Sequence, residues 1–194
     1  SQNSLLLRSN LFSSVVHDWI QWVPGDSYWS PVNYRNVWSR GIELNATLSM
    51  KSTRREAGGT LNYQYTRAGD RSPSEDENRI GKQLPYVPYH AAVMGVFWQN
   101  RKTGIRLNQR YTGKRYTTED NVPAYALDDW FRTDLHFCYC FGYRHWKAEL
   151  GAEIQNVFNA GYQMIRSYPL PGRAFFISLK IEWKEDRIAR RTRA

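Results

Sequence analysis

Residues 131–143 read Phe-Arg-Thr-Asp-Leu-His-Phe-Cys-Tyr-Cys-Phe-Gly-Tyr. From Phe131 to Tyr143 the odd positions are apolar or aromatic, apart from Thr133, and the even positions are mostly polar or charged. Successive side chains of a β-strand point to opposite faces, so this alternation predicts a strand with one apolar and one polar face. The run exceeds the ~5–6 residues of an ordinary strand and reaches the ~9–11 needed to cross a bilayer at a tilt.

The same alternation recurs along the chain and predicts about eight strands. The clearest further runs are 38–50, 61–66, 105–114, 146–154 and 175–183, and the runs 5–22 and 89–99 alternate less cleanly. Short connections are expected at 54–59, 100–104 and 142–145, and long ones at 23–35, 68–88, 117–129 and 158–171. An antiparallel meander with short turns at one end and long loops at the other is typical of an outer-membrane barrel. We therefore expect an all-β fold of transmembrane barrel strands.

Aromatic residues reinforce this prediction, because they make up 15% of the chain and gather at the ends of the predicted strands. Those at strand ends are Trp22, Trp38, Trp98, Trp130, Tyr143, Trp146 and Trp183. Rings at both ends of apolar strands are expected where a barrel meets the two membrane interfaces. A soluble β-sandwich, with the apolar faces turned inward, remains the alternative fold and would be a carbohydrate- or ligand-binding module.

Glycines interrupt the polar side of two predicted strands. Gly41 and Gly151 fall in mid-strand, where a glycine often marks a bend or the close approach of another group. No segment approaches the ~20 apolar residues of a transmembrane helix.

Residues 184–194 hold five basic residues against two acidic ones, a net +3 of the chain's +9, and we predict them to be a basic, flexible tail after a single unit formed by residues 1–183. A basic balance also suits a nucleic-acid binder, which is a third hypothesis. We expect no nucleic-acid partner, because a short basic terminus is usually a solvated tail.

Ordered motifs over nearly the whole chain resemble those of TonB-dependent outer-membrane receptors. Asn156-Val157-Phe158-Asn159, followed by Tyr162, is similar to the signature before the last strand of that family, and Tyr168-Pro169-Leu170-Pro171-Gly172-Arg173 resembles the segment that opens that strand. Leu84-Pro85-Tyr86-Val87-Pro88 is similar to a segment that precedes a barrel strand. The series 18–22, 29–33 and 39–44 is similar to one found most often in the vitamin-B12 (cobalamin) type.

This resemblance implies a role for the chain. It would form the last part of a barrel of about 22 strands and supply wall and extracellular loops to a transporter. The transported nutrient would be scarce and large: a cobalamin-like compound, haem or a ferric siderophore. The partners would be outer-membrane lipid, the rest of the barrel and its plug domain, the TonB complex and the small-molecule ligand, in the outer membrane of a Gram-negative bacterium. A small closed eight-stranded barrel is a second alternative, because open sheet edges in lipid are costly.

Six aromatic residues in the predicted long loops are the candidate ligand contacts: Tyr28, Trp29, Tyr116, Tyr125, Tyr162 and Tyr168. Such rings either grip an organic ligand or anchor a loop at the interface. His136, Cys138 and Cys140 share a strand face and carry metal-binding atoms, but no fourth ligand has the usual spacing. No nucleophile elbow, phosphate loop or dinucleotide motif is present. We therefore expect no catalytic residues, no metal and no cofactor, and a protein that is not an enzyme.

Overall fold

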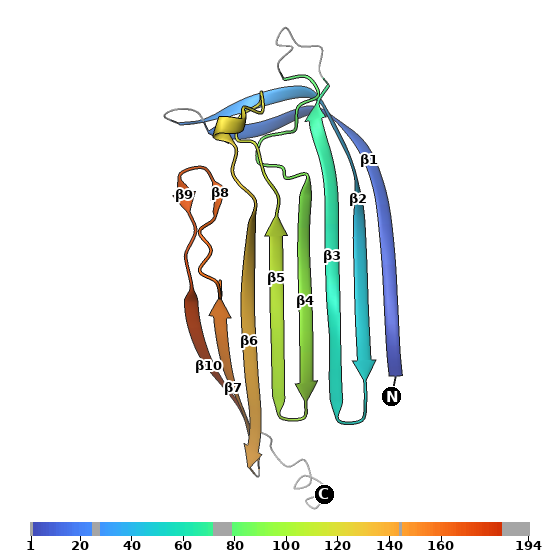
Figure 1. The fold of residues 1–194 in the computed structure, drawn as a ribbon, viewed down its shortest axis with the longest axis vertical. Helices are drawn as coiled ribbons and strands as arrows, with labels where there is room; N and C mark the ends of the chain where they lie inside the picture. The colour runs from blue at the N-terminus through green and yellow to red at the C-terminus, as the bar shows by residue number, and fades with distance from the viewer. Residues whose placement is uncertain (1, 25–27, 72–78, 144, 184–194) are drawn as a thin grey trace, which may run out of the picture.

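The fold is a single antiparallel sheet, described by a computed structural model over residues 2–24, 28–71, 79–143 and 145–183. Its eight strands follow one another in chain order, which confirms the predicted meander (Figure 1). The strands are β1 (Gln2–Pro24), β2 (Trp29–Lys51), β3 (Arg55–Asp70), β4 (His90–Asn100), β5 (Thr103–Thr112), β6 (Trp130–Tyr143), β7 (Trp146–Gln155) and β10 (Ala174–Trp183).

Smaller elements sit in the connections. The 3₁₀ helix η1 (Pro123–Tyr125) lies between β5 and β6, and the short hairpin of β8 (Gln163–Ile165) and β9 (Tyr168–Pro169) lies between β7 and β10. Within the described residues, no helix is both long enough and apolar enough to span a membrane.

Short turns and long connections lie at opposite ends of the sheet, as predicted (Figure 1). Two predicted boundaries were wrong. β3 already begins at Arg55, so residues 55–59 belong to a strand and not to a turn. The expected long loop 23–35 is mostly a paired hairpin, since Val23 faces Ser30 and Pro24 faces Trp29. On one face Gln21, Ser30 and Val32 are half-buried, and Gln21 donates to the carbonyl oxygen of Pro85 at 3.1 Å. Because two of these three half-buried positions are polar, this end of the hairpin lacks the apolar–polar alternation that marks a half-buried strand.

The strand register gathers the apolar positions into rows that cross the whole sheet. One row runs through Leu5, Leu48, Gly59, Val96, Leu107, Leu135, Ile154 and Phe175. Leu5 (64% accessible), Leu48, Val96 and Phe175 (67%) are exposed, Leu107, Leu135 and Ile154 are half-buried, and none of them is buried, so the row does not form the core of a soluble protein. The sandwich alternative is wrong, because it needs a second large sheet packed over this face, and the other sheet among the described residues is the two-stranded β8–β9 hairpin in a loop.

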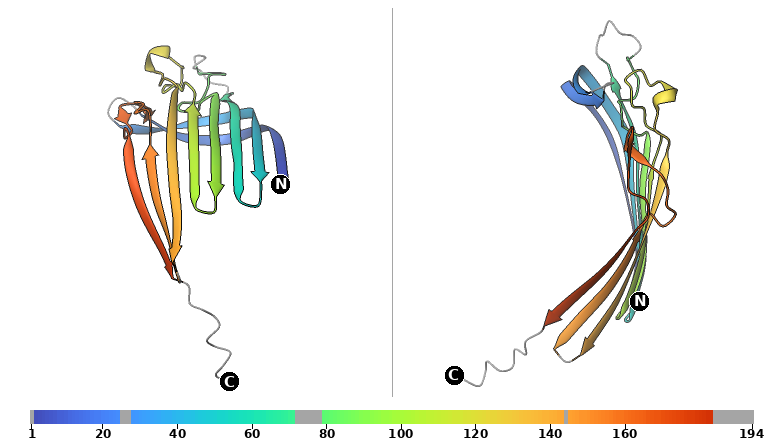
Figure 2. Two further views of the ribbon diagram at one scale, coloured as in Figure 1. Left: turned by 60° about the horizontal axis from the view of Figure 1, so that its bottom comes forward. Right: turned by 90° about the vertical axis from the view of Figure 1, so that its left-hand side faces the viewer.

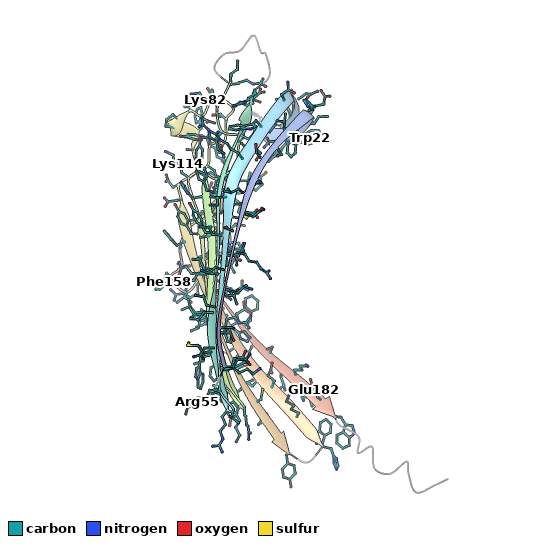
Figure 3. All side chains as sticks on the ribbon, turned by 90° about the vertical axis from the view of Figure 1, so that its right-hand side faces the viewer. Trp22, Arg55, Lys82, Lys114, Phe158 and Glu182 are labelled. Carbon is teal, nitrogen blue, oxygen red and sulfur yellow. The ribbon has the colours of Figure 1, made fainter. Side chains whose placement is uncertain are left out.

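The sheet is curved and not flat. Seen edge-on, the upper ends of β1 and β2 and the lower ends of β7 and β10 bend to the same side (Figures 2 and 3). β1 and β10 are the two ends of the strand order and do not pair with each other in the described part of the chain. The small closed barrel is therefore also wrong. The predicted tail 184–194 lies outside the described residues.

Candidate functional site

The end of the sheet that carries the long loops is braced by a buried glutamine. The Gln83 side chain, in a residue that is 1% exposed, donates from Nε2 to the carbonyl oxygens of Thr66 (3.1 Å) and Val87 (3.2 Å). Its Oε1 accepts from the backbone N–H of Ala68 at 3.0 Å. These bonds fix the segment 79–89 against β3, beside a small apolar core of Val37, Ala68 and Leu84.

The same segment is tied to the loop between β5 and β6. The Gln83 N–H donates to Asn121 Oδ1 (2.9 Å), and Asn121 Nδ2 donates back to the Gln83 carbonyl (2.8 Å). The Tyr86 N–H donates to the carbonyl of Tyr116 at 2.7 Å. Arg79 pairs with Glu119 at 2.8 Å. Asn121 has a positive φ of 57°, which asparagine tolerates better than most residues.

A buried arginine joins this loop to the β8–β9 hairpin. Arg115 is 4% exposed and donates to the carbonyl oxygens of Gln163 (3.0 Å) and Asp128 (3.4 Å). Burial lowers the pKa of the Arg115 guanidinium from its usual value. Arg166, in the β8–β9 turn, places its guanidinium carbon 4.5 Å from the Tyr125 ring centroid.

The predicted signature that starts at Asn156 forms the turn that follows β7. Asn156 has φ 52°, and its side chain both accepts from and donates to the Ala160 backbone at 2.9 Å. Its N–H donates to Asp134 Oδ1 at 2.8 Å. Asn159, also at φ 52°, accepts from the Arg173 N–H at 2.9 Å. The two asparagines therefore shape the loop from within.

A cavity of about 470 Å³ lies between the β5–β6 loop and the β8–β9 hairpin, with Trp130, Tyr162 and Arg166 in its lining. The rings of Trp130 and Tyr162 are 4.5 Å apart, and the Tyr162 hydroxyl accepts from Arg132 at 3.1 Å. Arg132 also pairs with Asp134 at 2.8 Å on the polar face.

The structure separates the six candidate aromatics into two groups. Tyr28 (75% exposed) and Trp29 (39%) lie at the free end of the β1–β2 hairpin, where Trp22 also lies, on the side toward which the sheet bends (Figure 3). Tyr125 (45%) and Tyr168 (64%) are exposed on the other loops, Tyr116 is half-buried, and Tyr162 is buried at 8%.

The polar face holds a second cavity of about 380 Å³, whose lining includes Arg106, His136 and Glu153. Among the described residues no His, Cys, Asp or Glu side chains form a group of three or more that could hold a metal ion. His136, Cys138 and Cys140 are thus neighbours on one strand without a metal-binding geometry.

Sequence reasoning missed Gln83, Arg115 and Arg166. Asn121 had a usable signal, since asparagine favours turns with positive φ. No local pattern distinguishes Arg115 from the exposed Lys114 beside it, because its burial depends on the hairpin that arrives from β8.

A family model described as "TonB dependent receptor-like, beta-barrel" matches residues 1–157. The solved structure of the ferric-catecholate import receptor Fiu from K12 E. coli is 18% identical, with a TM-score of 0.63 over 90% of this chain and 25% of that one. The copper transporter OprC is 15% identical, with a TM-score of 0.65 over 93% of this chain and 29% of that one. BauA, the ferric preacinetobactin receptor from Acinetobacter baumannii, is 16% identical, with a TM-score of 0.64 over 91% and 27%.

These structural matches show the shared fold. The chain spans about a quarter to under a third of the length of these structures.

Proposed function

Because the chain belongs to the family of TonB-dependent receptor-like β-barrels, we propose that it forms part of the wall and the extracellular loops of an outer-membrane importer. The observation that carries this proposal is the apolar face of the sheet, which is exposed across all eight strands while the opposite face is polar. Exposure of an apolar face of this size to water is unfavourable, and the face is suited to contact with lipid.

The dimensions of the apolar face support a membrane position. On β4 the positions from His90 to Trp98 span about 27 Å at ~3.4 Å per residue. A strand tilt of ~40° reduces this to about 21 Å, close to the ~25 Å apolar band of such barrels. Aromatic contacts border it: Tyr65 lies 5.2 Å from His90 at the loop end, and Trp146 lies 4.5 Å from Trp183 at the turn end.

The proposed cargo is a scarce, large nutrient, namely a ferric siderophore, haem or a cobalamin-like compound. The matched structures named above are a ferric-catecholate receptor, a copper transporter and a ferric preacinetobactin receptor, so a metal-bearing compound is the common theme. The motif series 18–44 of the cobalamin type keeps cobalamin among the candidates.

Ligand contact is proposed for Tyr28, Trp29, Tyr116, Tyr125, Tyr162 and Tyr168. Tyr28 and Tyr168 offer exposed rings to a ligand between the loops, and Tyr125 is half-exposed with the Arg166 guanidinium carbon 4.5 Å from its ring centroid. Tyr162 contributes through its position, since it holds Trp130 and Arg132 beside the cavity between the loops.

The plug that closes the barrel and the energy for transport are proposed to come from partners. The polar face would border a plug domain, and the TonB complex would supply the energy for transport. The charged residues of the polar face suit contact with a water-filled barrel interior. The Arg132–Asp134 pair is half-buried on this face. This role is transport and not catalysis.

The test uses the full-length protein, expressed in a Gram-negative host that lacks its own receptors for ferric siderophores, haem and cobalamin. We expect heat-modifiable migration on gels, recovery from the outer-membrane fraction, and TonB-dependent uptake of one of these labelled compounds. Recovery of a monodisperse, folded protein in buffer without detergent would contradict the proposal.

A further inference from the structure

An arginine cluster lies on the apolar face at its loop end. Arg40 on β2 and Arg67 on β3 are direct register partners, so their side chains leave the sheet side by side on the face that carries the apolar rows. Arg71, just after β3, continues the same alternation beyond Gly69. All three residues are exposed.

Trp38 holds two of these charges together. Its ring centroid lies 3.9 Å from the guanidinium carbon of Arg40 and 4.2 Å from that of Arg71. The two cations are therefore within about 8 Å of each other, and both stack on one ring. Like charges directly opposite on neighbouring strands repel, so this arrangement favours an anion between them.

The sheet supplies no such anion on this face. Every acidic residue of the regular ladder points to the polar side: Glu43, Glu56, Asp70, Asp134, Glu149, Glu153 and Glu182. Asp18 is the one acidic strand residue outside this set, at an interruption of the register with φ 54°. No described ion pair involves Arg40, Arg67 or Arg71 in the ranges that the structure covers.

The depth of the cluster matches that of lipid headgroups. Tyr65 pairs in register with Ile42 and stacks with Tyr89 at 6.4 Å, which places aromatic rings at the upper border of the apolar rows. Arg40 lies two residues beyond Ile42, about 7 Å further along the strand. The guanidinium groups thus stand just outside the aromatic border, where the phosphates of a bilayer lie.

We propose that Arg40 and Arg71, stacked on Trp38, together with Arg67 bind the phosphate groups of an anionic lipid headgroup in the leaflet that surrounds the loop end. Guanidinium groups form bidentate hydrogen bonds with phosphate oxygens, and three of them on one face, two stacked on Trp38, suit a headgroup with more than one phosphate. This inference rests on the proposed membrane position of the apolar face.

The experiment uses the full-length protein in neutral phosphatidylcholine nanodiscs to which lipid A or dephosphorylated lipid A is added. Native mass spectrometry counts the bound lipid. We expect retention of lipid A at least tenfold above that of the dephosphorylated form, and a roughly 10- to 100-fold loss of retention in the triple variant Arg40→Gln, Arg67→Gln, Arg71→Gln.

Two control variants separate charge from folding. The variant Arg54→Gln, Arg55→Gln, Arg101→Gln removes the same charge from the opposite end, where Figure 3 labels Arg55, and we expect a change below twofold. The triple Arg→Lys variant of the cluster keeps the charge, so we expect most of the retention to return. Heat-modifiable migration confirms insertion of each variant.

Equal retention of lipid A and its dephosphorylated form by an inserted wild-type protein would overturn the arginine cluster and leave the membrane proposal intact. Equal loss in the two Arg→Gln variants would also overturn it, because the effect would then be one of net charge. Failure of the wild-type protein to enter nanodiscs would overturn both proposals.

Discussion

Gln83 and Asn121 exchange hydrogen bonds across two loops: the Gln83 N–H reaches Asn121 Oδ1 at 2.9 Å, and Asn121 Nδ2 reaches the Gln83 carbonyl at 2.8 Å. The same glutamine side chain is bonded to β3 through Ala68 and Thr66. The loop from β5 to β6 is therefore anchored to the sheet through another loop. These hydrogen bonds connect β3, the segment 79–89 and the β5–β6 loop. We therefore expect the two loops to become mobile together when the bonds between them are removed.

The first prediction concerns the hydrogen bonds between Gln83 and Asn121. Asn121→Ala removes both bonds and leaves the Gln83 backbone groups unsatisfied, which costs about 1–3 kcal/mol locally. We expect faster amide exchange in residues 79–89 and 115–127 of the full-length membrane protein, measured by hydrogen–deuterium exchange. Asn100→Ala, which removes two comparable side-chain bonds in the opposite β4–β5 turn, is the control and should leave these segments unchanged. Unchanged exchange in Asn121→Ala would contradict this connection between the loops.

Arg115 is the second test of the bracing. Arg115→Met keeps the buried stem and removes the bonds to the carbonyls of Gln163 and Asp128. We expect the β8–β9 hairpin to detach from the β5–β6 loop, with increased exchange or proteolysis near Gln163 and a local loss of about 1–3 kcal/mol. Lys114→Met, one residue earlier and exposed, is the matched control. Similar exchange and proteolysis in the two variants would show that the Arg115 hydrogen bonds do not hold the β8–β9 hairpin to the β5–β6 loop.

Asn156 allows backbone and side-chain effects to be separated. Asn156→Ala loses the side-chain bonds to Ala160 and places alanine at φ 52°, so we expect a loss of about 2–3 kcal/mol in the turn. Asn156→Gly removes the φ penalty and keeps the loss of the bonds. Thermal unfolding by the loss of heat-modifiable migration should rank the proteins as wild type, Asn156→Gly and Asn156→Ala. Equal values for the two variants would assign the whole effect to the side chain.

The strands could be predicted because the sheet has one apolar and one polar face. Each residue of 131–143 faces either an apolar or a polar medium, so the sequence itself alternates and predicts β6 almost to its ends. One face of the upper part of the β1–β2 hairpin instead packs on the segment 79–89, and polar residues such as Gln21 and Ser30 take half-buried positions there. The pairing of this part, including Val23 with Ser30, is therefore invisible to a period-two pattern.

The candidate site was less predictable, because its arrangement depends on contacts between distant segments. Tyr162 and Tyr168 look alike in sequence, yet one stacks on Trp130 and the other is 64% exposed. That difference arises from the turn set by Asn156 and Asn159, which directs the chain back over β6. The aromatic residues of the long loops can be identified from the sequence, but which of their rings are exposed depends on the fold.

The last prediction tests this division among the aromatic residues. Tyr125→Ala and Tyr168→Ala remove exposed rings, so we expect weaker uptake of the transported compound, by roughly three- to tenfold each. Thermal unfolding should be unchanged for Tyr168→Ala, and Tyr125→Ala should lose about 0.5–1 kcal/mol because its contact with Arg166 is removed. Tyr162→Phe keeps the ring on Trp130 and loses only the hydroxyl that accepts from Arg132. We expect that variant to lose about 0.5–1.5 kcal/mol of local stability and to keep its affinity. Uptake assays and thermal unfolding on the full-length protein distinguish these outcomes. If Tyr162→Phe weakened uptake while both alanine variants transported normally, the ligand would contact the buried cavity and not the exposed rings.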